Sequence, residues 1–352
     1  KMLEAGAVGG VGAAAYMGSL LLAMAMMVGS VFSRLEGRRT LLLPVVVMIG
    51  STLKVCWDKI FQYIKQELDA ARCPGSEVSS TDWVGTVSRM SECRSRSWLA
   101  QPPGQIFLKA YELVTLDASG WFWSQILLAL VTPLLLHLHV NRASFKRWER
   151  LAFTGVGLLG AICSAFSAAL LLLNVLNARN KHLRVKKDES NKVEQDVEVS
   201  SAAIASGFLS LLCVFFLPRT VSSSKNAFAF FLIFLHLSLC APCVEASSWK
   251  PMVDSKGFSR RKLFFAVGIC SALLHLEALL SGLYGRNVSS LITAALSNPC
   301  QISIFADAML STGFVVLYML STSGARAFKY IALAPLLGPG AMFSFHLRGE
   351  PF

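Results

Sequence analysis

Hydrophobic residues gather in nine long blocks that are separated by short polar segments. Each block is long enough, at about 17 to 26 residues, to cross a hydrocarbon layer of about 30 Å as a helix. The pattern therefore predicts an all-α, polytopic transmembrane helix bundle of eight or nine spans. The blocks run from about 7 to 32, 40 to 57, 120 to 140, 151 to 176, 201 to 217, 227 to 244, 263 to 284, 303 to 321 and 328 to 347.

One polar segment, 58–119, is large enough to form an extramembrane loop of about 60 residues. Within it, apolar residues recur on one helical face over 104–116, which predicts an amphipathic helix lying in the membrane interface. The expected organisation is a first transmembrane hairpin at 1–57, this loop at 58–119, a second hairpin at 120–176, a charged linker at 177–200 and the remaining spans at 201–352.

Composition and charge agree with a membrane protein. Of 352 residues, 54% are hydrophobic and only 15% are charged, whereas a soluble domain carries about a quarter charged residues. The net charge of +12 sits mostly beside the apolar blocks, where it would meet lipid headgroups, and this favours lipids over nucleic acid as the partner. Basic turns near Arg38, Arg147 and Arg219 are expected to share one side of the membrane, facing the compartment from which the chain is inserted.

The beginning of the chain has no secretory signal pattern. It opens with Lys1 and Met2, without a basic region followed by a short apolar stretch and a cleavage site. We therefore expect a processed organellar precursor.

Glycine patterns in the apolar blocks favour helix packing over nucleotide binding. Residues 155–160 have the G-x-G-x-x-G spacing, but they lie inside an apolar block instead of between a strand and an amphipathic helix. A stripe of small residues every four positions predicts close contact with another helix; it consists of Gly157, Ala161, Ala165 and Ala169. No nucleophile elbow, H-E-x-x-H motif, P-loop or paired acidic motif is present, so neither a catalytic residue nor a metal site is predicted.

Four of the nine cysteines suggest specific chemistry. Cys240 and Cys243 have the C-x-x-C spacing of a redox dithiol, although buried structural thiols explain the pair better because no βαβ pattern surrounds it. Cys73 and Cys93 are the two cysteines of the extramembrane loop, and in an oxidising lumen they would form a disulfide.

Ionisable residues inside apolar blocks are candidates for function because they are costly in lipid. Five could supply an axial ligand to the magnesium of chlorophyll: His236, His275, Glu277, His137 and His139. The histidines among them could also bind the iron of haem. Alternatively, Glu277 and Asp307 could form a proton or cation site, as in secondary transporters. Hydrogen bonds between helices would satisfy any one of these groups without a ligand.

The last block is expected to be a broken helix. It contains Pro335, Gly338, Pro339 and Gly340, and each proline removes a helical hydrogen bond. Broken helices line substrate sites in transporters, and they also bend around neighbours, pigments or lipids.

The last 50 residues or so resemble small, uncharacterised multi-span membrane proteins of cyanobacteria and plastids. The resemblance rests on an aromatic and an aspartate opening a span (302–307), a turn at 324–326 and an apolar tail over 339–350. The E-G-R-R turn of that group occurs here at 36–39, in the first hairpin instead of the last. The resemblance implies a thylakoid location in preference to the mitochondrial inner membrane, and it names no activity.

Two functions follow. The first is a non-catalytic, structural subunit of a larger organellar, photosynthetic membrane complex, with other membrane subunits and lipids as partners and with chlorophyll and carotenoid as pigments. The second is a secondary transporter or channel with an intramembrane acidic site. A thiol oxidoreductase using Cys240 and Cys243 is a more distant third.

Overall fold

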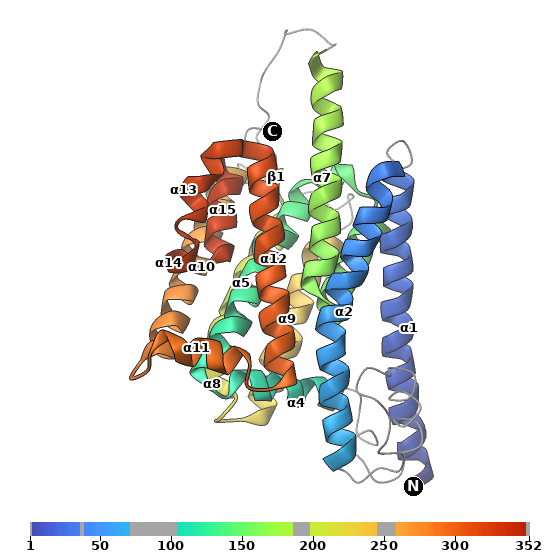
Figure 1. Cartoon of the computed structure of the whole chain (residues 1–352), viewed down its shortest axis with the longest axis vertical. Coiled ribbons are helices and arrows are strands. Elements are labelled where there is room, and N and C mark those ends of the chain that lie inside the picture. Colours follow the sequence, from blue (N-terminus) through green and yellow to red (C-terminus); the bar gives the residue numbers. More distant parts are fainter. Residues whose placement is uncertain (1, 36–38, 71–103, 186–197, 245–257, 350–352) are drawn as a thin grey trace.

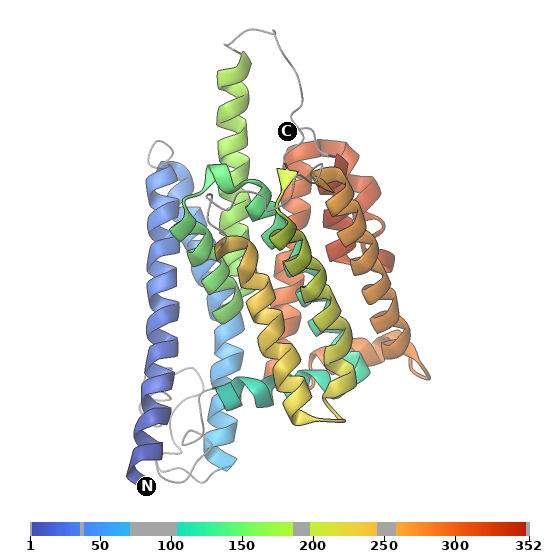
Figure 2. The same cartoon turned by 180° about the vertical axis from the view of Figure 1, so that it is seen from behind.

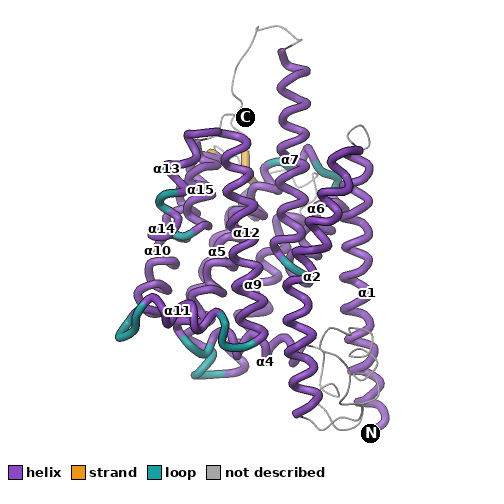
Figure 3. Tube along the Cα trace, viewed as in Figure 1, coloured by secondary structure: helices purple, strands orange, loops and turns teal. Residues whose placement is uncertain are grey.

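The computed structural model describes residues 2–35, 39–70, 104–185, 198–244 and 258–349. Nearly all of them are helical, and a two-residue antiparallel pair, β1 (Glu198–Val199) with β2 (Phe258–Ser259), is the one sheet among them (Figure 3). The protein is thus an all-α helix bundle, as the sequence predicts.

Seven long helices run the height of the bundle (Figure 1, Figure 2). They are α1 (Met2–Leu35), α2 (Arg39–Ala70), α5 (Ala118–Val140), α8 (Ser201–Thr220), α9 (Lys225–Val244), α10 (Arg260–Leu283) and α12 (Pro299–Ser323). Six helical segments in the described part of the chain are long and apolar enough to span a membrane, one in each of these helices except α2. The chain is therefore an integral membrane protein.

The prediction of eight or nine spans is not confirmed, because six of the described segments are long and apolar enough to span and two of the nine blocks form interrupted helices that fold back. The block at 151–176 is interrupted and forms two helices, α6 (Arg147–Leu159) and α7 (Ile162–Val185). A Cβ atom on Gly157 of α6 would lie 3.5 Å from Cβ of Ala165 of α7, so the chain folds back at 160–161. α6 is about 20 Å long, which is too short to cross the apolar layer. From here on we call this α6–α7 unit the first hairpin; the name no longer refers to the pair of spans at 1–57.

The block at 328–347 forms a second hairpin from α13 (Phe328–Ile331), α14 (Ala334–Leu337) and α15 (Pro339–Gly349). The break predicted from its prolines and glycines is confirmed, and the chain reverses at Gly338, whose φ of 82° favours glycine. The start of α15 lies beside the middle of α5, since a Cβ on Gly340 would meet the carbonyl of Ala129 at 2.7 Å. Its end lies beside the start of α10, where Arg260 donates to the carbonyl of Leu347.

Both hairpins enter the bundle from the same end and stop near its middle (Figure 1). We call this end, where α1 and α15 finish, the upper end. The lower end holds α4 (Gly104–Thr115) and α11 (Val288–Ala295). The helix predicted over 104–116 is therefore present, and its place in the membrane interface stays a prediction, although we call α4 the interfacial helix.

The first hairpin changes the sidedness expected for the basic turns. Because α6 and α7 return to the upper end, α8 runs downward, and the turn between α8 and α9 with Arg219 and Lys225 lies at the lower end (Figure 2). The prediction that this turn shares a side with the turns near Arg38 and Arg147 is wrong. Arg260 and Arg261 begin α10, and this end of α10 lies at the upper end with those two turns.

The small-residue stripe is split between the two arms of the first hairpin. Gly157 lies on α6, whereas Ala165 and Ala169 lie on α7. A Cβ on Gly157 would meet the ring of Phe166 at 3.1 Å, and Ala161, Ala165 and Ala169 are all buried. Close packing of these residues is therefore confirmed, with the hairpin's own second arm as one of the neighbours.

Candidate functional site

A cavity of about 610 Å³ lies between the tip of the first hairpin and the interfacial helix α4. Its walls come from α2, α5, α9 and α12, and most of its lining is aliphatic or aromatic. A volume of this size suits a small organic molecule, and such sites combine an apolar lining with a few placed polar groups. The polar or ionisable residues of the lining are Cys56, Tyr111, Ser124, His236, Cys300, Ser303 and Asp307.

Asp307 of α12 holds the tip of the first hairpin. One carboxylate oxygen accepts the backbone N–H of Cys163 at 2.6 Å, and the other accepts the N–H of Ile162 at 2.9 Å. These N–H groups open α7 and have no partner within that helix. A buried carboxylate at a helix N-terminus is stabilised by the helix dipole as well as by the hydrogen bonds. Ser311 also donates to Asp307, at 3.3 Å.

Two thiols meet beside this carboxylate. Sγ of Cys56 on α2 lies 4.0 Å from Sγ of Cys163 at the start of α7, and both residues are buried. One ligand atom each from Cys56, Cys163 and Asp307 lie within 4.8 Å of one another. Neighbouring hydroxyls fix the surrounding helices: Thr52 and Ser164 are 2.8 Å apart, and Ser303 donates to the carbonyl of Cys56. The result is a compact polar cluster inside an apolar bundle.

Tyr111 and His236 form a second polar pair on the cavity wall. Nδ1 of His236 lies 2.8 Å from the carbonyl of Leu232, so Nδ1 carries the proton and Nε2 is the acceptor. The Tyr111 hydroxyl, 3.4 Å from that Nε2, is then the donor. Burial raises the pKa of Tyr111 to about 12, and the Asp307 carboxylate adds to the effect. The phenol therefore stays protonated at any physiological pH.

The turn of the second hairpin is contacted by a histidine, His275, whereas the tip of the first hairpin is bound by Asp307. Nε2 of His275 on α10 lies 3.3 Å from the carbonyl of Pro335, and its ring packs against Phe122. The backbone of Gly338 approaches that ring so closely that a Cβ would lie 2.6 Å from Cγ of His275. His275 therefore fills the space beside the turn and does not line the cavity.

The other predicted ligands are distributed through the bundle. His137 is bonded to the Tyr318 hydroxyl at 3.0 Å, and His139 to the carbonyl of Pro242 at 2.9 Å. Glu277 forms a half-exposed ion pair with Arg219 at 3.0 Å. The structure thus brings His236 and Asp307 to one cavity and leaves His137, His139, His275 and Glu277 outside its lining.

The cysteines singled out by spacing have different outcomes. Cys73 and Cys93 lie outside the described residues, so their disulfide stays a prediction. Cys240 and Cys243 are free thiols, and Cys243 lies 2.9 Å from the Thr154 hydroxyl.

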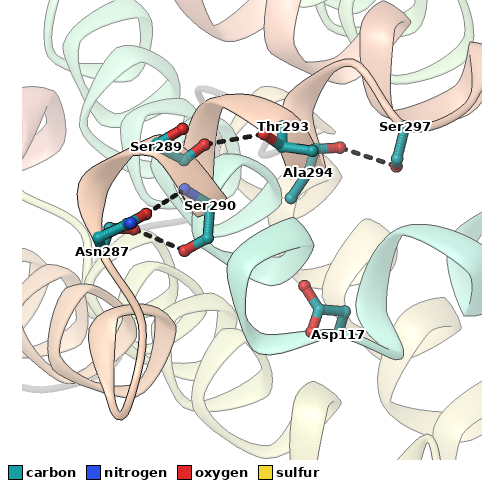
Figure 4. A pocket seen from close by; sticks show the side chains of 7 residues that line it. All are labelled: Asp117, Asn287, Ser289, Ser290, Thr293, Ala294 and Ser297. Carbon is teal, nitrogen blue, oxygen red and sulfur yellow. Dashed lines mark hydrogen bonds between the residues drawn. The ribbon is translucent and has the colours of Figure 1, made fainter.

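A surface hollow of about 430 Å³ at the lower end is lined by Asp117 and by small polar residues of α11 and its flanks (Figure 4). Its hydroxyls are satisfied locally: Ser290 donates to the carbonyl of Asn287, and Thr293 to that of Ser289. Asp117 is paired with Arg286 at 2.6 Å. These contacts stabilise the ends of α5 and α11, and they give no indication of a binding or catalytic site in this hollow.

Sequence reasoning did not find the roles of Cys56, Cys163 and Tyr111. The first two stand alone in separate apolar blocks, and only the fold brings them together. One signal was available, since Gly160 and Cys163 with Ser164 interrupt an apolar block near its middle. Tyr111 lies within the helix predicted at 104–116, but no sequence pattern places it opposite a histidine.

No protein-family model, curated protein or solved structure matches the chain. The fold therefore defines the class, an integral membrane helix bundle with two hairpins that enter from one end. The resemblance of the last 50 residues to plastid and cyanobacterial proteins stays a prediction.

Proposed function

We propose that this chain is a secondary transporter that carries a small, largely apolar solute with one cationic group. The observation that supports the proposal is the position of Asp307, which lines an apolar cavity and at the same time holds the tip of a hairpin that ends inside the bundle. Broken or re-entrant helices are tolerated at membrane depth where they line a cavity, and transporters use them to form substrate sites.

The lining supports this class of solute. Trp57, Leu128 and Leu232 offer apolar contacts to a hydrocarbon or aromatic body. Asp307 offers a negative charge, and a desolvated carboxylate favours a cation over an anion. The Tyr111–His236 pair adds hydrogen-bonding groups elsewhere on the same wall.

Asp307 also couples the solute to the hairpin. When a proton or the cationic group of the solute neutralises the Asp307 carboxylate, the carboxylate becomes a weaker acceptor for the N–H groups of Ile162 and Cys163. The tip is then held less tightly, and the cavity changes shape with its occupancy.

The experiment is a proton-flux assay on purified chain reconstituted in lipid vesicles with an imposed pH gradient. Ethidium, a flat apolar cation, serves as the probe. We expect ethidium to dissipate the gradient through the wild-type chain, and we expect Asp307→Asn to abolish this flux. Ala229→Trp, a larger side chain on the cavity wall, should reduce the flux without removing a charge.

The matched control is Glu277→Gln, since Glu277 is an acid of a spanning helix that does not line the cavity. Its flux should equal that of the wild type. Flux that is unchanged in Asp307→Asn, or no ethidium-dependent flux above that of empty vesicles, would contradict the proposal.

A second candidate is a pigment-bearing subunit of a photosynthetic membrane complex, and His236 is the observation that favours it. Among the predicted axial ligands, His236 lines the cavity, and its Nε2 is an acceptor. A chlorophyll magnesium would need that lone pair, which Tyr111 now occupies. The visible absorption spectrum of the native chain tests this candidate, because a bound pigment should be lost in His236→Leu and kept in His139→Leu.

A further inference from the structure

Cys56, Cys163 and Asp307 come from three elements that are far apart in sequence. They lie on α2, at the start of α7 and on α12, and all three are buried. Burying two thiols and a carboxylate in an apolar bundle is costly unless they share partners. Their ligand atoms lie within 4.8 Å of one another, which is close enough for one metal ion to reach all three after small side-chain movements.

We infer that these three residues form a binding site for a thiophilic divalent cation of the Zn²⁺ class. Two thiolates and a carboxylate are donors that zinc prefers. The 4.0 Å between the two sulfur atoms is close to the roughly 3.8 Å that a tetrahedral ion with Zn–S bonds of about 2.3 Å requires. A small side-chain rotation would therefore complete the geometry.

Asp307 can bind an ion without releasing the hairpin. Each of its oxygens accepts one backbone N–H, and Oδ1 also accepts the Ser311 hydroxyl. Oδ2 accepts the N–H of Ile162 and has a second lone pair for a ligand bond. Ion binding exchanges two thiol protons for the metal, so that two protons leave and the ion's two positive charges replace them. The site then carries one net negative charge, and the N-terminus of α7 directs its N–H groups toward it.

The cavity gives the metal ion a path to the three residues and gives water access to its fourth coordination position. Cys56 and Asp307 line it, whereas Cys163 approaches from the hairpin side. Three protein ligands leave one tetrahedral position, which water can fill from the cavity. A bound ion would tie the hairpin tip to α2 and α12 together. This inference concerns the same site as the proposed transport, but metal binding is measured without any flux, so that each can fail alone.

The test is a metal analysis of the full chain purified in detergent under reducing conditions. After incubation with Zn²⁺ and desalting, mass spectrometry of the metal should find one Zn²⁺ per wild-type chain. Cys56→Ser and Cys163→Ser should each lose it. The matched control is Cys300→Ser, because Cys300 is equally buried on the same cavity and stands outside the cluster.

Substitution with Co²⁺ gives a second readout, because thiolate ligands are detected directly in the wild-type chain, with no substitution that could disturb its fold. Thiolate-to-cobalt charge-transfer absorption should appear in the wild type and in Cys300→Ser, and Zn²⁺ should displace it. Retention of Zn²⁺ by Cys56→Ser, absence of thiolate–cobalt absorption in the wild type, or a Cys56–Cys163 disulfide found by peptide mapping of protein purified without reductant and unaffected by added Zn²⁺ would each overturn the inference.

Discussion

The carboxylate of Asp307 accepts the backbone N–H of Cys163 at 2.6 Å, although 144 positions separate the two residues in the sequence. The contact joins a spanning helix to the tip of a hairpin that folds back inside the bundle. It satisfies a polar backbone group where water is scarce, and it places a charge beside the cavity.

The first prediction concerns the stability of this contact. Asp307→Ala would leave the N–H groups of Ile162 and Cys163 without an acceptor, and a buried unsatisfied group costs about 1–3 kcal/mol. We expect a loss of about 3 kcal/mol in the free energy of unfolding, measured by denaturant titration in detergent. Asp307→Asn retains one acceptor oxygen and should lose less. Equal losses in the two variants would argue against a role for these hydrogen bonds.

The second prediction concerns pH. Glu149, at the start of α6 and outside the spanning segments, accepts bonds from Arg34 at 2.6 Å and Ser30 at 2.7 Å. Burial alone would raise the pKa of Glu149, but these bonds and that from the backbone of Lys146 lower it overall. The carboxylate therefore stabilises the fold above about pH 4.3, the ordinary value, and the contribution is lost as pH falls through the lowered pKa.

Unfolding of the wild type and of Glu149→Gln at several pH values measures this effect. The difference should be about 2 kcal/mol at neutral pH, as for hydrogen bonds to a charged group, and should shrink in acid. Glu277→Gln is the control, since that ion pair is half-exposed and is expected to contribute little. A difference for Glu149→Gln that does not change with pH would refute the argument.

The third prediction concerns the turn of the second hairpin. Gly338→Ala combines a positive φ with a Cβ that would lie 2.6 Å from the ring of His275, and we expect a loss of about 2–3 kcal/mol in stability. Gly313→Ala on α12 is the matched control, because nothing lies within 4 Å of its Cβ position. Adding His275→Ala to Gly338→Ala should recover the part of the loss caused by the ring atoms, because the Cβ of residue 275 stays 2.9 Å away. If it recovers nothing, backbone strain and the contact with that Cβ explain the loss.

The fourth prediction concerns sidedness. Single cysteines introduced at Ser223, between α8 and α9, and at Ala143, between α5 and α6, should react with a membrane-impermeant maleimide from opposite sides of sealed vesicles. Labelling of both from one side would mean that the first hairpin crosses the membrane. The basic upper end should face the compartment from which the chain is inserted.

The helix class, the helix at 104–116 and the break in the last block were predictable from the sequence, because each depends on local pattern. Periodicity identified 104–116, and paired prolines and glycines identified the break near Gly338. The first hairpin could not be predicted, since 151–176 contains no charged residue and Gly160, Cys163 and Ser164 are only a weak interruption of the apolar pattern.

The candidate site was predictable only in part. Asp307 stood out as an acid inside an apolar block, and the sequence indicated a site there. Glu277 looked equivalent, but it pairs with Arg219 at the lower end of α8, which no pattern within α10 could reveal. The convergence of Cys56 and Cys163 depends on the fold-back at 160–161, so it could not be inferred while that block was read as one span.

The long sequence separation between Asp307 and the hairpin tip has a consequence for biogenesis. During synthesis α7 is complete long before α12 emerges. Until then, the first N–H groups of α7 lack the Asp307 carboxylate that accepts their hydrogen bonds in the finished fold. The first hairpin can therefore settle into its final place only after α12 has been inserted. Assembly of this protein should be governed by the arrival of its C-terminal part, and a chain released before α12 should be a substrate for membrane quality control.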